Sequence, residues 1–268
     1  AEDLRIDYSI LDQHAESYRK IRNTFRYLLG NLNDIFAETD LEKIEIKKLP
    51  ELEQFMLHKI YEIDSNFKKY FKNYDFHNLY KELLNFCTVD LSAFYFDIRK
   101  DILYCDSKES EKRKSTLLIL NIILNSLLKW FAPILSFTTE EIYQLVSKQK
   151  KSIHLERFLS FPQKFKNSEL NEKWTKLLKV RDICNLSIEE KRASKEIGSS
   201  LEATLILKLT KNDAQLIKEI DLSELCITSS VEIKNDQFEE TKVETIKAKG
   251  KKCPVCWKIS EKPCIRHG

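Results

Sequence analysis

Hydrophobic residues recur at three- and four-residue steps along most of this chain, the spacing that places side chains on one face of an α-helix. In the stretch 18–33, one stripe of the predicted helix consists of Ile21, Phe25, Leu28 and Leu32. The same spacing predicts helices over residues 9–36, 51–73, 110–131 and 168–196, and a bulky aromatic helix pair over 75–105. The pattern therefore predicts a mostly α fold.

Local chemistry predicts where several of these helices begin and end. Glycine and asparagine between Gly30 and Asp34 favour the end of the first helix. Pro133 ends the helix over 110–131, and Thr138-Thr-Glu-Glu141 has the pattern of a capping box that starts another. Gly198 is expected to be the C-cap of the helix over 168–196.

The pattern changes in the last third of the chain. A linker is expected after Gln149, beginning with Lys150 and ending at Phe165. From residue 201 the apolar positions alternate, which predicts a strand with one face formed by Ala203, Leu205, Leu207 and Leu209. A short helix over 213–220 and β-leaning segments over 224–234 and 240–247 follow. These elements predict a small α/β module.

Charged residues stand among the aromatic side chains of 75–105. The aromatic residues Phe86, Phe94, Tyr95 and Phe96 are expected to fill a core. The charged set, expected to form a polar seam, is Asp90, Asp97, Arg99, Lys100 and Asp101. Asp97 and Asp101 have the i, i+4 spacing of a catalytic carboxylate pair, but no nucleophile or base converges on them. We therefore expect structural ion pairs.

Composition excludes several classes of protein. With only 4 glycines and no Gly-x-Gly-x-x-Gly or P-loop pattern, the chain lacks the phosphate loops of nucleotide-binding enzymes, and no catalytic residue is predicted. Four of the seven cysteines stand singly in apolar contexts, a pattern typical of reduced, cytosolic proteins.

Membrane insertion and secretion are also not expected. The longest apolar run, around 117–128, is interrupted by Asn121, Asn125 and Ser126, so no membrane span is predicted. The charged first residues do not form a signal peptide. A cytoplasmic location is expected, and Ala1 in place of Met suggests a piece of a longer protein.

A row of arginines lies opposite the hydrophobic stripe of the first helix. Arg19, Arg22 and Arg26 stack at i, i+3 and i+7, with the amide of Asn23 beside them. Guanidinium groups bind phosphate oxygens in pairs and stack on bases, so this row suits an anionic polymer. The net charge of only +3 requires such binding to come from local patches. The alternative is a solvated helix face.

A second group of cations lies on the helix over 168–196. Helical-wheel geometry places its members within a sector of ~100°: Arg181, Lys191, Arg192 and Lys195.

The last residues carry two pairs of metal-ligand type. Cys253 and Cys256 form a Cys-x2-Cys knuckle, and Cys264 and His267 form a Cys-x2-His pair seven residues later. Three thiolates and an imidazole suit one tetrahedral zinc ion, which would be structural because four protein ligands leave no open position. A polar tail this short cannot fold on a hydrophobic core, so bound metal would stabilise it. The alternative is a chance pairing of Cys264 with His267 at a frayed terminus.

Several segments resemble bacterial isoleucyl-tRNA synthetases of class I. They are the stretch 18–33, Asp-Ile-Arg-Lys-Asp-Ile-Leu-Tyr-Cys over 97–105, Ala-Pro-Ile-Leu-Ser-Phe-Thr-Thr-Glu-Glu over 132–141, Ile-Gly-Ser-Ser-Leu-Glu-Ala over 197–203, and Trp257 after its knuckle. The resemblance covers residues 3–268 and the C-terminal portion of that family.

This resemblance implies a domain organisation. It consists of a helical anticodon-binding domain over 1–149, a linker and long helix completing the tRNA-binding region over 150–200, an α/β junction module over 201–247 and a zinc-binding, ribbon-like tail over 248–268.

The resemblance also implies a function. The chain would bind the anticodon stem-loop of isoleucine tRNA, while a catalytic domain elsewhere attaches isoleucine with ATP. The class I motifs His-Ile-Gly-His and Lys-Met-Ser-Lys-Ser do not occur, so this part alone is expected to be inactive. We expect a monomer that binds neither DNA nor membrane.

The residues expected to contact this tRNA come from three parts of the chain: Arg19, Arg22, Asn23, Arg26, Arg181, Arg192, Lys195 and Trp257. Trp257 would stack on a base. The tail departs from the family in its short gap between knuckles, in His267 in place of a fourth cysteine, and in Val255 where relatives carry an arginine that approaches the anticodon loop. Six cations are expected to compensate by contacting phosphate: Lys247, Lys249, Lys251, Lys252, Lys258 and Arg266.

Two other functions remain possible from the residues alone. A helical bundle with a zinc ribbon could be a protein-interaction module without RNA specificity. A small metalloenzyme would instead require a metal with an open position for water.

Overall fold

The computed structural model describes residues 6–32, 35–147, 151–234 and 238–267. The chain forms two compact units. The first comprises Ala1–Leu103 with Ser107–Asn167, and the second comprises Tyr104–Asp106 with Ser168–Gly268. The four-part division expected from the sequence stays a prediction. Positions 3–5 and Lys150, which belong to the resemblance and the expected linker, lie outside the described residues.

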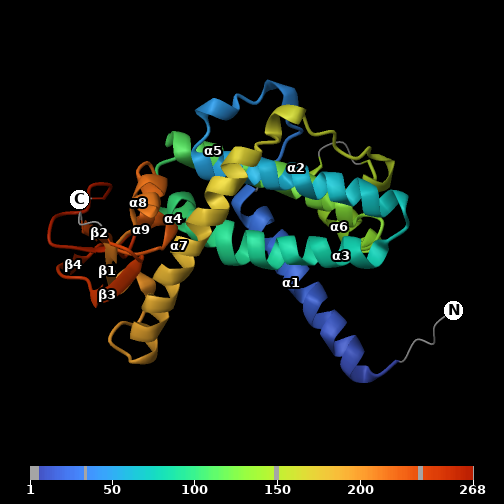
Figure 1. Ribbon diagram of the computed structural model, residues 1–268. Helices are drawn as coiled ribbons and strands as arrows, with labels where there is room; N and C mark the ends of the chain where they lie inside the picture. Colours follow the sequence, from blue (N-terminus) through green and yellow to red (C-terminus); the bar gives the residue numbers. More distant parts are fainter. Residues whose placement is uncertain (1–5, 33–34, 148–150, 235–237, 268) are drawn as a thin grey trace. The chain divides into compact units, whose positions relative to one another are not determined.

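Helices form the first unit (Figure 1). They are α1 (Tyr8–Leu32), α2 (Glu51–Lys72), α3 (Phe76–Asn85), α4 (Asp97–Cys105, whose last two residues belong to the second unit), α5 (Glu111–Phe131) and α6 (Ser136–Val146). Short 3-10 turns occur at Leu41–Lys43, Ile46–Lys48, Ile153–Leu155 and Gln163–Phe165. The mostly α prediction is confirmed. Asn33 and Asp34, where the end of the first helix was expected, lie outside the described residues.

Helix α5 is the centre of this unit, because it packs on α1, α2 and α6. All residues from Ile119 to Phe131 are buried, including the polar Asn121, Asn125, Ser126 and Lys129. A helix that is apolar all round is expected in a core rather than on a surface. The stripe of α1 faces this core, since Ile21, Phe25, Leu28 and Leu32 are each at most 1% exposed.

The segment 76–105 is one continuous helical stretch, so the predicted helix pair is wrong. Between α3 and α4 the residues Phe86–Phe96 are wound as a π-helix, and the residues at both junctions keep right-handed helical angles. The sequence here has no glycine or proline that would break a helix. The four aromatic residues expected in the core are buried in this stretch.

The predicted capping box of α6 is also wrong. The helix begins at Ser136, after Leu135, and has no side-chain cap. Both threonines lie inside the helix instead. The hydroxyl of Thr138 is 2.8 Å from the phenol oxygen of Tyr18 on α1, while Thr139 donates to the carbonyl of Leu135. Thr138 therefore joins α6 to α1, and neither threonine caps the start of the helix.

The second unit combines a long helix with a small sheet (Figure 1). Its helices are α7 (Ser168–Ala193), α8 (Lys211–Ile217) and α9 (Leu222–Leu225), with a 3-10 turn at Ser200–Glu202. Its strands are β1 (Ala203–Lys208), β2 (Ser230–Lys234), β3 (Lys242–Lys247), β4 (Lys251–Lys252) and β5 (Ile259–Ser260). The segment 224–234 is thus a strand only from residue 230.

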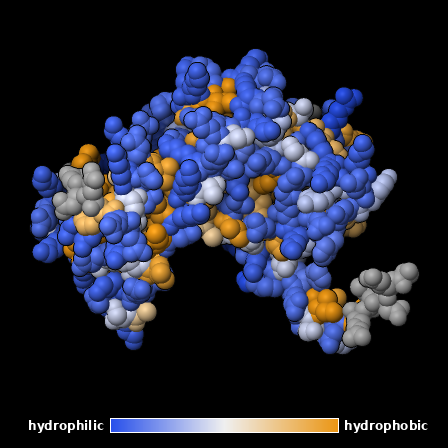
Figure 2. All heavy atoms as spheres, viewed as in Figure 1, coloured by the Kyte–Doolittle hydropathy of each residue, from blue (hydrophilic) through white to orange (hydrophobic). Residues whose placement is uncertain are grey.

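Strand β1 is central in a three-stranded sheet of order β2-β1-β3. It pairs in parallel with β2 and antiparallel with β3, and α7 packs on β3 and α8. The alternation predicted for this strand is confirmed, because Ala203, Leu205 and Leu207 are fully buried. On the face that Figure 2 shows, surfaces are mainly hydrophilic and hydrophobic residues appear in separate patches.

Helix α7 ends before Gly198, so Gly198 is not its C-cap. The amide of Glu196 donates to the carbonyl of Lys191, and the amide of Lys195 donates to that of Arg192. This is the Schellman pattern, in which the residue after the cap is left-handed. Lys195 takes that conformation, with φ 61°. The helix therefore ends at a lysine where glycine would be less strained.

A two-stranded ribbon, β4 paired antiparallel with β5, holds the terminal tail. Gly250 precedes it with φ 118°, and a Cβ at this position would lie 2.2 Å from the carbonyl carbon of Ser260. Only glycine fits such a close approach of two backbones. In the described part of the chain, no helix has the length and apolarity needed to cross a bilayer.

Candidate metal centre and nucleic-acid interface

The ribbon brings the four predicted metal ligands together. One ligand atom from each of Cys253, Cys256, Cys264 and His267 lies within 4.8 Å of all the others. Turn hydrogen bonds shape the first knuckle: the amide of Cys253 donates to Lys258 at 2.9 Å, and that of Trp257 donates to Cys253 at 3.0 Å. The amide of His267 donates to Cys264 at 3.2 Å. Backbone geometry therefore fixes both pairs.

The distances fit tetrahedral coordination. The Sγ atoms of Cys256 and Cys264 are 3.8 Å apart, and Nδ1 of His267 is 3.6 Å from Sγ of Cys253 and 3.4 Å from that of Cys264. With metal–ligand bonds of about 2.3 Å for sulfur and 2.0–2.1 Å for nitrogen, a tetrahedron has edges of about 3.5–3.8 Å. Three of the six ligand–ligand distances thus match a tetrahedral site, and the four atoms together, all within 4.8 Å, could hold one metal ion.

Backbone amides also favour the thiolate form that binds metal. The N–H groups of Cys256 and Val255 lower the pKa of the Cys253 thiol to about 6. The N–H of Arg266 lowers the pKa of Cys264, whereas burial raises the pKa of Cys256. Two of the three sulfurs therefore have local donors that stabilise negative charge.

Trp257 projects beside this cluster. Its side chain is 58% exposed, and its backbone is left-handed with φ 65°. The ammonium of Lys252 lies 4.9 Å from the centre of the indole ring. Such a ring can stack on a base while the neighbouring ammonium contacts the phosphate of that nucleotide. Two of the compensating cations have other partners, because Arg266 pairs with Asp106 at 2.8 Å and Lys258 donates to Ser223 at 3.4 Å.

The arginines of α1 differ in their surroundings. Arg19 forms two hydrogen bonds with the carboxylate of Glu16, at 2.7 and 2.9 Å. Arg22 donates to the phenol of Tyr18 at 3.2 Å and lies 3.6 Å from the carboxylate of Glu141. Both pairs are largely exposed, and such pairs are worth little against solvent. Arg26 is exposed and makes no ion pair within the part of the chain that the structure describes.

Asn23 lines a cavity of about 460 Å³ between α1 and the π-helical segment. Other residues of its wall are Lys20, Tyr27, Ser92, Phe96 and Lys100. Tyr27 stacks on Phe96 with ring centres 4.3 Å apart. None of the described residues in this wall is acidic, although Lys100 pairs with Asp97 at 2.8 Å. Two ammonium groups, an amide and an aromatic ring suit a nucleotide.

Sequence reasoning missed Lys20 and Tyr27, although the signal was present. They stand three residues before and four residues after Asn23, so the three lie on one helical stripe. The opposite wall could not be found in this way. It depends on the π-helical winding of Phe86–Phe96, which the hydrophobic spacing does not show.

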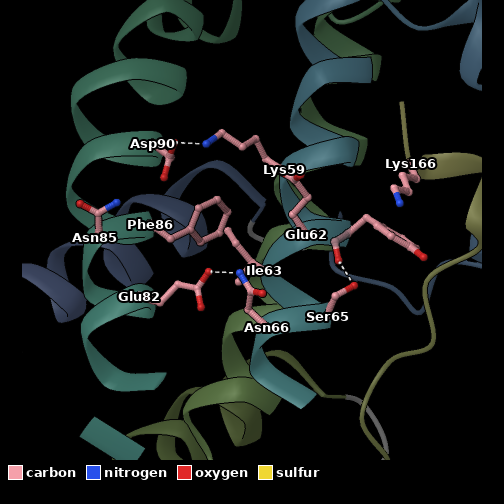
Figure 3. Close-up of a pocket in the computed structure, with 11 residues that line it drawn as sticks. Lys59, Glu62, Ile63, Ser65, Asn66, Glu82, Asn85, Phe86, Asp90 and Lys166 are labelled. Atoms are coloured by element: carbon pink, nitrogen blue, oxygen red, sulfur yellow. Dashed lines mark hydrogen bonds and ion pairs between the residues drawn. The ribbon is translucent and has the colours of Figure 1, made fainter. Parts of the chain in front are cut away.

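A second cavity in the same unit, of about 430 Å³, is much less suited to phosphate (Figure 3). Three carboxylates line it, from Glu62, Glu82 and Asp90, with the cations of Lys59 and Lys166. Lys59 is 3.2 Å from Asp90, and Asn66 donates to Glu82 at 2.8 Å. Burial raises the pKa of Glu82. The polar groups here largely satisfy one another.

Three of the four cations expected in one sector lie within α7, and one of them, Lys191, pairs with Glu196 at 2.9 Å. Arg192 pairs with Glu189 at 2.6 Å, and Lys195 stands beyond the helix end at Ala193. Both line a cavity of about 470 Å³. Arg181 is directed elsewhere, since its Nε donates to the carbonyl of Leu225 at 3.0 Å and so holds α9.

The central part of the chain matches a known family. The family described as the anticodon-binding domain of tRNA ligase matches residues 53–207, more than half of the chain. The chain belongs to this family. The anticodon-binding family match includes the buried helices and extends into β1, while α1 and the metal cluster lie outside it.

Curated relatives of this anticodon-binding chain match nearly all of it. An isoleucine–tRNA ligase of Pelagibacter ubique is 67% identical over 267 residues, covering 100% of this chain and 30% of the relative. Isoleucine–tRNA ligases of Bartonella quintana and Agrobacterium fabrum are 39% and 37% identical, each over 97% of this chain and 28% of their own length. The chain thus spans about a third or less of these relatives, in their C-terminal portion. The resemblance expected from the sequence is confirmed.

Proposed function

We propose that this chain is the tRNA-binding part of an isoleucine–tRNA ligase and that it recognises the anticodon stem-loop of isoleucine tRNA. The observation that carries the proposal is the anticodon-binding family match, combined with isoleucine–tRNA ligase relatives along the whole chain. Neither comparison favours a protein-interaction module. A catalytic domain outside this chain would attach isoleucine with ATP, and this part alone would form no aminoacyl-adenylate.

The proposed interface consists of the exposed side of α1 and the adjoining cavity. Lys20, Asn23 and Tyr27 would receive a nucleotide splayed from a single-stranded loop, where RNA sequence is read by stacking and by hydrogen bonds to base edges. Arg22 and Arg26 would contact backbone phosphates. Arg19 would do so after release from Glu16.

The second unit would add its own contacts. Arg192 and Lys195 line one cavity, and the exposed ring of Trp257 would stack on a base. Arg181 would contribute least, because it already donates to a backbone carbonyl. No relative orientation of the two units is needed for this proposal, since each surface can be tested by its own variants.

We further propose that Cys253, Cys256, Cys264 and His267 bind one zinc ion. Three sulfur ligands and one nitrogen at tetrahedral distances are the donor set that zinc prefers. When bound, the ion would supply folding free energy to the tail rather than a reactive water. Metal analysis of the purified chain should give one zinc per molecule. A monomeric state and a cytoplasmic location stay predictions.

Fluorescence anisotropy with isoleucine tRNA at several salt concentrations tests RNA binding. Affinity should fall as salt rises, because phosphate contacts release counterions. The substitution Arg26→Glu should weaken binding and make the salt slope shallower by about 0.7–0.9 for each phosphate that the variant no longer neutralises.

The matched control is Lys72→Glu, which reverses an exposed cation on α2 and should change binding much less. Equal weakening in both variants would show a diffuse charge effect and contradict the α1 assignment. Equal affinity for isoleucine tRNA and an unrelated tRNA would contradict anticodon recognition. Because the tail can bind zinc in either case, failure of RNA binding and failure of the metal site are separate results.

A further inference from the structure

The imidazole of His267 has two partners on opposite sides. Its Nδ1 faces the sulfurs of Cys253 and Cys264, while its Nε2 is 3.0 Å from the carbonyl oxygen of Cys105. Cys105 is the last residue of α4 and belongs to the same compact unit as the tail. The ring therefore connects the metal cluster to the turn Tyr104–Asp106.

Two further contacts hold the tail and the turn together. The guanidinium of Arg266 donates to the carboxylate of Asp106 at 2.8 Å, in a pair whose side chains are 32% and 14% exposed. The thiol of Cys105 donates to the carbonyl of Val255, inside the first knuckle, at 3.7 Å. Each knuckle thus has its own contact with this turn.

These contacts have a chemical consequence for a histidine ligand. An imidazole that binds metal through Nδ1 must carry its proton on Nε2, and the acceptor of that proton fixes both the tautomer and the ring orientation. A cysteine at the same position would need no such acceptor, because its thiolate has one ligating atom and no second donor.

We propose that the turn Tyr104–Asp106 is the outer support of the metal centre. The carbonyl of Cys105 selects the tautomer of His267 in which Nδ1 is the free ligand atom, and the Asp106–Arg266 pair keeps that carbonyl in place. Asp106 is thus a positioning residue for a ligand more than 150 positions away. The inference rests on the metal site proposed above and adds that His267 requires this turn.

The test is a double-mutant cycle on the full chain, read as zinc affinity in competition with a chromophoric chelator. The substitution Asp106→Asn should weaken zinc binding about tenfold, the low end for loss of an outer partner. In the His267→Cys background the same substitution should change affinity less than about twofold, because the thiolate does not use the carbonyl. As a control, Glu240→Gln removes an exposed pair with Lys242 in the same unit and should change nothing.

Each outcome decides the inference. If Asp106→Asn weakened zinc binding equally in both backgrounds, Asp106 would act on the tail as a whole. If it weakened zinc binding in neither background, the turn would be dispensable. Either result overturns the inference. If the unsubstituted chain binds no zinc, the metal site and the inference both fail. That result differs from the two above, in which the metal site stands and only the role of the turn fails.

A spectroscopic readout covers the case in which His267→Cys fails to bind. Nitrogen-15 NMR of the zinc-loaded chain should show Nδ1 of His267 bound to metal and Nε2 carrying a slowly exchanging proton. Asp106→Asn should speed that exchange while Nδ1 stays ligated. Metal at Nε2, or exchange unaffected by the substitution, would overturn the proposal.

Discussion

The carboxylate of Glu53 offers a strong test of how the helical unit is stabilised. It is fully buried and accepts four hydrogen bonds: two from Arg99, one from Tyr95 at 3.1 Å and one from Thr116 at 3.2 Å. Arg99 is itself only 2% exposed. Burial, and after it the charge of Glu53, raise the pKa of Tyr95, so the phenol stays a donor.

The substitution Glu53→Ala would remove the carboxylate from this buried guanidinium. Breaking a buried pair from one side costs about 3–5 kcal/mol, because the remaining charge has been taken out of water. Since domains are stable by about 5–15 kcal/mol, we expect the variant to lose about a fifth or more of its unfolding free energy. Urea denaturation followed by circular dichroism measures this as a lower midpoint with an unchanged slope.

An exposed pair on α4, the helix that carries Arg99, is the matched control. Asp97 and Lys100 are 2.8 Å apart, with side chains 41% and 52% exposed. The substitution Asp97→Asn should cost less than about 1 kcal/mol. If Glu53→Ala cost no more than Asp97→Asn, the buried network would not stabilise this bundle, and an unpaired Arg99 would not be costly to bury.

Three other predictions concern the proposed functional surfaces. Lys195→Gly should stabilise the chain by about 0.5 kcal/mol in urea melts, because relief of left-handed strain exceeds the entropy of glycine, while tRNA affinity falls with the missing charge. Removing metal with a chelator should unfold the tail and change the fluorescence of Trp257, with full recovery on adding zinc. Glu16→Gln should raise tRNA affinity about two- to fivefold in the anisotropy assay, because it frees Arg19.

Hydrophobic spacing predicted the helices well, because burial of one stripe is a local property of the sequence. The predicted range 51–73 became α2 at Glu51–Lys72, and 110–131 became α5 at Glu111–Phe131. The errors lie where backbone geometry departs from the usual rule for a residue type. Lys195 occupies a left-handed position that was assigned to glycine, and the π-helix has no distinct side-chain pattern.

The candidate site was predictable only in part for a related reason. The metal cluster combines four residues of known ligand chemistry at short spacing, so the sequence shows it directly. Hydrogen-bond partners that are far apart in the chain cannot be recognised from the sequence in this way. Nothing in the sequence pairs Arg99 with Glu53, 46 positions away, and the acceptor for His267 is a backbone carbonyl that every residue possesses.

The prediction for Glu16 follows from how an exposed ion pair competes with RNA. Arg19 must exchange the two oxygens of Glu16 for two phosphate oxygens, so part of its binding free energy is offset before any contact forms. Arg26 bears no such cost within the described residues, and Arg19→Ala should therefore weaken binding less than Arg26→Ala. Glu45→Gln, which frees Lys48 in the same way elsewhere in this unit, is the control. If Glu16→Gln lowered tRNA affinity, or if Glu45→Gln raised it as much as Glu16→Gln does, Arg19 would be a solvated residue and would not bind phosphate.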